Sequence, residues 1–245
     1  MRLSETFFGL FWPTVFAVIG IIILVMLGNW QMQRKAFKSD LIMLVDERIA
    51  SAPISFKALK ERAANGVDIR YQSVQVTGRF NHSFERHYFL PLNGKIGWHI
   101  ITPLTTATGD VVFIDRGFVP EEFKSQKRRL NGLPQDLVTI NGLARLGVTQ
   151  GFFTPDNDIK RNRWFWRDLD GLYASLPAAP KQRLNFMIDA ASNAKTGDWP
   201  LPGVTRVNFS DPHLGYALTW YGLALTLIGV YAAFAIHVMR RNRNP

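Results

Sequence analysis

The sequence predicts an α+β membrane protein, with N- and C-terminal transmembrane helices that form a hairpin and flank one mainly antiparallel β domain. Two charge-free apolar runs, at residues 7–29 and 214–239, bracket the 245-residue chain. A helix needs about 20 apolar residues to cross a hydrocarbon core of roughly 30 Å, and both runs are long enough. Between them, apolar and polar residues alternate in short segments separated by turn signals, which is typical of β structure.

The first run is expected to be an uncleaved anchor, transmembrane helix 1 at residues 7–29. It is too long for the apolar region of a signal peptide, and no small-residue cleavage site follows it. Beyond it, Leu41, Leu44, Val45 and Ile49 recur at helical spacing before Pro53. We therefore expect a helical stem at 31–50, at the start of a water-facing domain at 30–212.

The domain is predicted to be β-rich with few helices. Its first strand is expected from Tyr71, with a bulge at Gly78. Further candidate strands are His87–Leu92, Trp98–Leu104, Val111–Val119, Leu137–Leu146, Trp164–Arg167, Leu184–Ile188 and Thr205–Phe209. Short helices are expected at Glu121–Leu130 and Asp168–Ala174. Short connections between the strands favour antiparallel pairing.

Transmembrane helix 2 is expected at 213–239, followed by a basic tail at 240–245. Asp211 could cap this helix, and Pro212 suits a helix start. Positive charges are balanced between the two sides of the membrane, so charge does not orient the chain. Long domains are translocated largely regardless of that rule. We expect the bacterial plasma (inner) membrane, with cytoplasmic termini and a periplasmic domain.

The composition excludes several classes of function. The chain has no cysteine, which rules out disulfides and thiol chemistry. Its net charge of +10 is scattered, so we expect contact with lipid headgroups or a merely solvated surface, and no nucleic acid. The sequence has no nucleophile elbow, P-loop or dinucleotide loop, and His82, His87 and His99 are too scattered for a zinc site. We therefore do not expect an enzyme. The alternative is a membrane enzyme whose polar site is formed by residues that are distant in sequence and meet only in the folded chain.

His213, at the mouth of the second span, is the candidate metal ligand. A neutral imidazole binds iron or copper well, and Tyr216 and Trp220 are expected on the same helix face. The alternative is a histidine that lies at the membrane interface without a ligand, as we expect for His237 at the other end of the span.

The end of the first span has a matching feature. Trp30 and Arg34 are four residues apart and share a helix face. Arg34 could hold a propionate, a phosphate or a carboxylate in a bidentate manner, or simply reach lipid headgroups. A tight hairpin would bring this face level with His213, an arrangement that suits a haem.

Six segments stand out in order along the chain: Leu27-Gly28-Asn29-Trp30-Gln31 with Arg34 and Lys38, Gly97 to Leu104, Val112 to Pro120, Phe153 to Asn157, Trp164 to Asp168, and His213 to Gly222. Together they resemble the Surfeit-locus protein 1 family of cytochrome c oxidase assembly factors. The sequence departs from the family pattern where Asp115 and Phe118 replace an Asn and a Trp. It departs again where Asp211-Pro212 replaces Asn-Asn before the histidine.

The resemblance implies an accessory protein, not an oxidase subunit, that assists maturation of subunit I of haem–copper oxidases. It implies transient binding of haem a, with the family's histidine at His213. Our extension of that site to Tyr216 and Trp220 comes from the helix pattern. The implied partners are subunit I and the lipid membrane, with haem a synthase as a further candidate. The alternative function is a cofactor-free chaperone that stabilises nascent subunit I.

Overall fold

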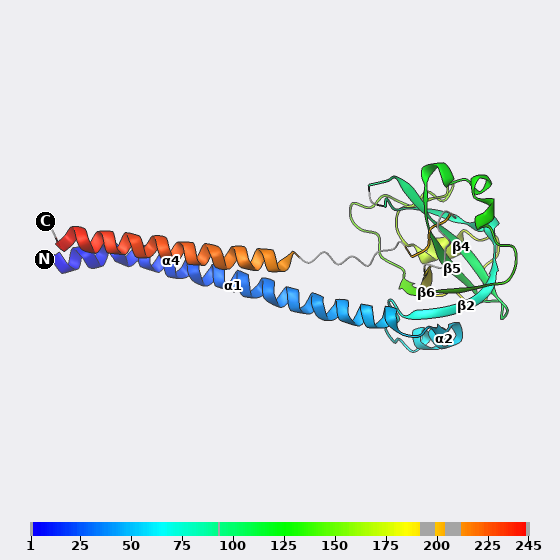
Figure 1. The fold of residues 1–245 in the computed structure, drawn as a ribbon, viewed down its shortest axis with the longest axis horizontal. Coiled ribbons are helices and arrows are strands. Elements are labelled where there is room, and N and C mark those ends of the chain that lie inside the picture. Colours follow the sequence, from blue (N-terminus) through cyan, green and yellow to red (C-terminus); the bar gives the residue numbers. More distant parts are fainter. Residues whose placement is uncertain (1, 93, 192–198, 204–211, 244–245) are drawn as a thin grey trace. The chain divides into compact units, whose positions relative to one another are not determined.

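The computed structural model describes residues 2–92, 94–191, 199–203 and 212–243 (Figure 1). It divides into a helical unit, Met1–Leu44 with Asn208–Pro245, and a β unit, Val45–Val207. The predicted fold class is confirmed, since an N-terminal and a C-terminal apolar helix flank one β-rich domain. The candidate strand Thr205–Phe209 and the candidate cap Asp211 lie outside the described residues.

The helical unit is built from α1 (Arg2–Ala50) and α4 (His213–Arg243), which run side by side (Figure 1). α1 is continuous from Arg2 to Ala50, so residues 31–50 extend the same helix as the first apolar run. Within the described residues, Leu10–Ala50 and His213–Arg241 are long and apolar enough to cross a membrane.

The two helices pack along a seam with a spacing of three and four residues. The more buried positions of α4 include His213, Ala217, Trp220, Ala224, Leu227 and Tyr231, and those of α1 include Thr14, Ala17, Leu24, Gly28 and Gln31. This period is typical of helices that pack with a slight left-handed supercoil. Ala17, Ala217 and Ala224 are at most 5% exposed, and such small residues allow the backbones to approach closely.

The β unit contains a closed ring of strands. Its strands are β1 (Ile54–Ser55), β2 (Ser73–Phe80), β3 (Arg86–Phe89), β4 (Gly97–Thr106), β5 (Val111–Pro120), β6 (Val138–Leu146), β7 (Arg163–Trp164) and β8 (Phe186–Ala190). Their order is β1-β2-β6-β8-β5-β4-β3-β7, and an additional pairing between β2 and β4 closes β2, β6, β8, β5 and β4 into a barrel. Pairing is antiparallel except for β1 with β2, β3 with β7, and β5 with β8. As in other small barrels, side chains fill the interior, among them Val76, Leu104, Phe113 and Ile188, each at most 1% exposed.

Several short elements surround the barrel. α2 (Phe56–Ala64) was not expected, although its signal is present: Leu59 is fully buried, and the Ser55 hydroxyl caps the helix by accepting a hydrogen bond from the Ala58 amide at 3.2 Å. α3 (Leu169–Ala174) occupies the expected short helix and is capped by Asp168. The predicted helix Glu121–Leu130 is wrong. Three separate 3₁₀ turns (Glu121–Phe123, Gln126–Arg128 and Leu130–Gly132) occupy this region, and none has a side-chain cap.

The predicted bulge at Gly78 is also wrong. Gly78 pairs regularly with Val138 of β6 and Thr106 of β4. A Cβ atom there would lie 2.6 Å from the Thr105 carbonyl oxygen, so glycine is needed because two strands meet β2 at this point. The irregularity lies between β4 and β5. His99 pairs with Phe118 and Ile101 pairs with Asp115, so one residue of β4 lies opposite two residues of β5. The extra residue therefore falls in β5, next to Gly117, whose φ is +109°.

Candidate functional site

His213 is the first residue of α4 and faces α1. Its Nδ1–H donates a hydrogen bond to the Gln31 side-chain oxygen at 2.8 Å. Gln31 lies in the turn of α1 just past the first apolar run, on the seam between the helices. The structure therefore brings the entrance of the second span to the exit of the first, through Gln31.

Trp30 and Arg34 form a pair of their own on the surface of α1. Trp30 is 47% exposed, and the Arg34 guanidinium carbon lies 5.6 Å from the centre of its ring. A cation at this distance from an aromatic face is attracted by the ring's electron density. Both residues belong to the same turns of α1 as Gln31, but Gln31 makes the contact with the histidine.

The aromatic residues expected beside His213 separate onto two sides of α4. Tyr216 is 55% exposed, whereas Trp220 is half-buried on the seam with Ala217 and Ala224. The next residue after Trp220 is Tyr221, whose hydroxyl donates to the Asn29 side-chain oxygen at 2.8 Å. The end of the helix pair thus has two polar contacts between α1 and α4, at Gln31 and at Asn29.

Gln31 is the site residue that sequence reasoning missed, although a signal for it exists. It lies three residues after Gly28 and seven after Leu24, and all three face the same side of α1. A polar side chain at a seam position indicates a hydrogen bond to the partner helix. Trp30 and Arg34 lie on a different face of α1 and carry the more familiar ligand chemistry, whereas the signal of Gln31 is its seam position.

The three histidines of the β unit have separate partners. His82 Nε2 is 2.8 Å from the Pro134 carbonyl oxygen, His87 bonds Glu85 at 3.0 Å, and His99 bonds Asp115 at 2.8 Å. Within the described residues, no group of three histidine, aspartate or glutamate side chains could hold a metal ion.

Two of these histidines belong to buried ionic groups. Burial by itself would raise the pKa of Glu85, but hydrogen bonding from His87 and the charge of Arg129 hold that pKa below its usual value. Burial likewise opposes protonation of His99, but the Asp115 carboxylate raises the His99 pKa overall. Burial, followed by repulsion from Asp115, raises the pKa of Asp189 to about 6. These are ionic pairs within a packed interior, and their geometry indicates a structural role.

Comparison with known proteins places this architecture in one family. The family model described as the SURF1 family matches residues 18–225. The chain is 34% identical over 219 residues to Surfeit locus protein 1 of Gallus gallus, which covers 80% of this chain and 67% of that protein. It is 32% identical over 234 residues to a SURF1-like protein of Monosiga brevicollis (89% of this chain, 85% of that protein). It is also 31% identical over 216 residues to Surfeit locus protein 1 of Homo sapiens (81% and 69%). The chain therefore belongs to the SURF1 family.

Proposed function

We propose that this protein is an assembly factor for haem–copper cytochrome c oxidase that assists delivery of haem a to subunit I. Membership of the SURF1 family and the two apolar helices support an accessory role at a membrane. The proposed setting is the bacterial plasma membrane, with the domain periplasmic. Subunit I is the proposed partner, and haem a synthase is the proposed donor. The single observation that carries the haem-binding part is the hydrogen bond between Gln31 and His213.

The hydrogen bond selects one tautomer of the imidazole. Because the Gln31 oxygen accepts from Nδ1–H, the lone pair of neutral His213 lies on Nε2. Histidines that bind metals are usually oriented in this way, with the second ring nitrogen donating to a fixed oxygen. His213 therefore has the tautomer that suits ligation of iron through Nε2.

The surroundings also fit a haem. The exposed rings of Trp30 and Tyr216 offer apolar surface, and the Arg34 guanidinium offers a partner for a carboxylate. When bound, haem a would be cargo. A single histidine at the end of a span suits this role, because one exchangeable ligand releases its cargo more readily than two.

The test is the visible absorption spectrum of the full-length protein purified from cells that make haem a. His213→Ala should lose the pigment, and Gln31→Leu should weaken haem binding by about 10- to 100-fold, as expected when an orienting hydrogen bond is removed. His237→Ala is the matched control, because His237 lies at the opposite end of the same helix, and it should retain full pigment. If the folded His213→Ala variant keeps its haem content unchanged, His213 is not the haem ligand.

A cofactor-free chaperone is the second candidate, favoured by an exposed aromatic pair. Phe152 and Phe153 are 95% and 94% exposed, with ring centres 4.9 Å apart. Exposed aromatic side chains are typical anchors of protein–protein contacts. If subunit I co-purifies with this protein while no preparation contains pigment, the chaperone function stands and haem delivery does not.

A further inference from the structure

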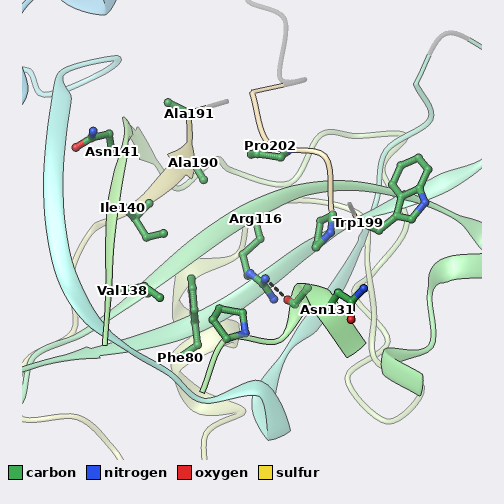
Figure 2. Close-up of a pocket in the computed structure, with 13 residues that line it drawn as sticks. Phe80, Arg116, Asn131, Val138, Ile140, Asn141, Ala190, Ala191, Trp199 and Pro202 are labelled. Carbon is green, nitrogen blue, oxygen red and sulfur yellow. Dashed lines mark hydrogen bonds between the residues drawn. The ribbon is translucent and has the colours of Figure 1, made fainter. Parts of the chain in front are cut away.

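The β unit contains a cavity of about 390 Å³ between β6, the ends of β2 and β8, and the segment 199–202 (Figure 2). Its walls are mainly apolar, with Phe80, Val138 and Ile140 on one side and Trp199 and Pro202 on the other. Its volume is in the range of about 300–1,000 Å³ typical of small-molecule sites.

Glycines allow the segment 199–202 to pack closely beside this cavity and form one of its walls. A Cβ atom on Gly117 would lie 1.8 Å from the Leu201 carbonyl oxygen, and one on Gly132 would lie 1.9 Å from the Trp199 oxygen. Phe118 and Leu201 exchange two backbone hydrogen bonds, at 2.8 and 2.9 Å. The segment 199–202 is thus held against this side of the cavity by backbone contacts that only glycine permits at these two positions.

Arg116 lies in the middle of the cavity wall (Figure 2). The extra residue of β5 is placed beside Gly117, and a bulge of this kind redirects a neighbouring side chain. One terminal nitrogen of Arg116 donates to the Gly132 carbonyl oxygen, and the guanidinium lies 4.8 Å from the centre of the Phe80 ring. These two contacts hold the guanidinium in place before any ligand arrives.

The other terminal nitrogen of Arg116, Nη1, is buried and has no hydrogen-bond partner among the described residues. Arg116 is also the only charged side chain among the described residues that line the cavity. Burial, and then repulsion by Arg129, lowers the pKa of Arg116 to about 10, so the group is still charged at neutral pH. Arg116 has no salt bridge among the described residues, and Glu85, whose charge acts on Arg116, is already paired with Arg129. Desolvating a cation that lacks such a partner is costly, and an anion that enters the cavity would relieve that cost.

We propose that this cavity binds a small amphipathic carboxylate, with the carboxylate on Arg116 and the apolar body against Phe80, Val138, Ile140 and Trp199. A carboxylate matches the single cation, whereas a phosphate dianion would call for a second positive charge. A guanidinium recognises a carboxylate by charge-assisted hydrogen bonds, and the apolar walls exclude water from them. This site shares no residue with the proposed haem site, so neither proposal depends on the other.

The experiment compares two probes that differ only in charge. 4-Phenylbutyrate and its neutral amide are titrated into the detergent-solubilised full chain, and binding is measured by calorimetry and by saturation-transfer NMR. We expect saturable binding of the carboxylate and at least about tenfold weaker binding of the amide, the cost of losing a charged hydrogen bond. Equal affinities, or no saturable binding of the carboxylate at millimolar concentration, would overturn the proposal.

Variants then locate the binding. Arg116→Met should reduce carboxylate affinity to that of the amide, and Arg116→Lys should restore part of it. Val138→Phe should weaken both probes by filling the cavity. Thr139→Phe is its matched control, since Thr139 points to the other face of β6 and bonds Thr77 at 2.8 Å, and it should leave both affinities unchanged. If Arg116→Met fails to fold, the Val138 and Thr139 pair still decides the location. Equal effects of those two variants would contradict it.

Discussion

The helical unit and the β unit distribute the same apolar residue types in opposite ways. In each candidate span only 6% of the most apolar window is buried within the protein, so large side chains such as Ile22 and Leu225 are exposed. The β unit instead has a packed core in which large apolar side chains such as Ile100, Leu104 and Phe113 are fully buried. In water, exposed apolar surface costs about 25 cal/mol per Å². The difference shows that the helices are suited to lipid and the domain to water.

Polar groups differ between the units as well. Along the helix seam, polar side chains meet in hydrogen bonds such as the Gln31–His213 and Asn29–Tyr221 contacts. Inside the β unit they are ionic, as in the buried Glu85–Arg129 and Asp115–His99 pairs. Small residues and side-chain hydrogen bonds therefore hold the helices together, whereas the domain depends on a packed core with desolvated ion pairs.

Arg129→Met tests this dependence with the largest expected effect. Arg129 is 4% exposed and is held by Glu85 and by the Phe123 carbonyl oxygen at 3.0 Å. Its loss leaves the buried Glu85 carboxylate without a guanidinium partner and with only the His87 hydrogen bond, so we expect destabilisation by about 3–5 kcal/mol at pH 7. This loss of stability is measured by thermal unfolding of the full chain in detergent, with near-UV circular dichroism as the signal.

The pH dependence of this effect has a definite sign. The folded-state pKa of Glu85 is lowered, so its contribution to stability is present above the unfolded pKa and is lost as the pH falls. The deficit of Arg129→Met should therefore shrink near pH 4. The control is Arg161→Met, which removes an exposed pair with Asp158 and should change stability by less than about 1 kcal/mol. Equal losses of stability in Arg129→Met and Arg161→Met would show that the buried Glu85–Arg129 pair contributes no more than an exposed pair.

Asp115→Asn should have an intermediate effect that appears as a change of pH profile. The raised pKa of His99 gives stability that is lost as the pH rises through the folded pKa. The raised pKa of Asp189 also makes stability fall as the pH rises from about 4 to about 6. Removing the Asp115 charge lowers both pKa values. The free energy of unfolding of the variant should therefore vary less with pH, by about 1.4 kcal/mol for each unit by which a pKa falls. Unfolding temperatures at pH 5, 6, 7 and 8 measure it, and parallel profiles would contradict the assignment.

Gly28→Ala has the smallest expected effect and tests the helical unit. A Cβ atom there would lie 2.5 Å from the Tyr221 ring, which can move but would strain its bond to Asn29. Overpacking costs about 1–3 kcal/mol, and alanine recovers up to about 1 kcal/mol of helix propensity. Gly222→Ala is the control, because a Cβ at Gly222 meets nothing within 4 Å. In a detergent titration, α1 and α4 of Gly28→Ala should separate at a lower detergent concentration than those of the unaltered protein, whereas Gly222→Ala should behave like the unaltered protein. Identical curves for the two variants would argue against close packing at Gly28.

Much of the fold followed from local pattern. The spans depend on length and composition alone, and β2, β4, β5 and β6 show clear strand patterns, so they lie close to the predicted segments. The errors have local causes. Gly78 resembles a bulge in isolation, but it is required by a second strand that the sequence does not reveal. The region from Glu121 to Leu130 has helix-forming residues but no caps, and it breaks into turns.

The sequence by itself determined the two apolar helices, the β character of the domain, the family and the choice of His213 as candidate ligand. Only the tertiary structure decided that Gln31 contacts His213, that β2 pairs with β4 to close the barrel, and that Arg116 faces an apolar cavity. The physical reason is sequence separation. Helix and strand patterns are set by neighbours a few residues apart, whereas Gln31 and His213 are 182 residues apart. Contacts of that kind depend on how whole elements pack, and packing is a property of the folded chain.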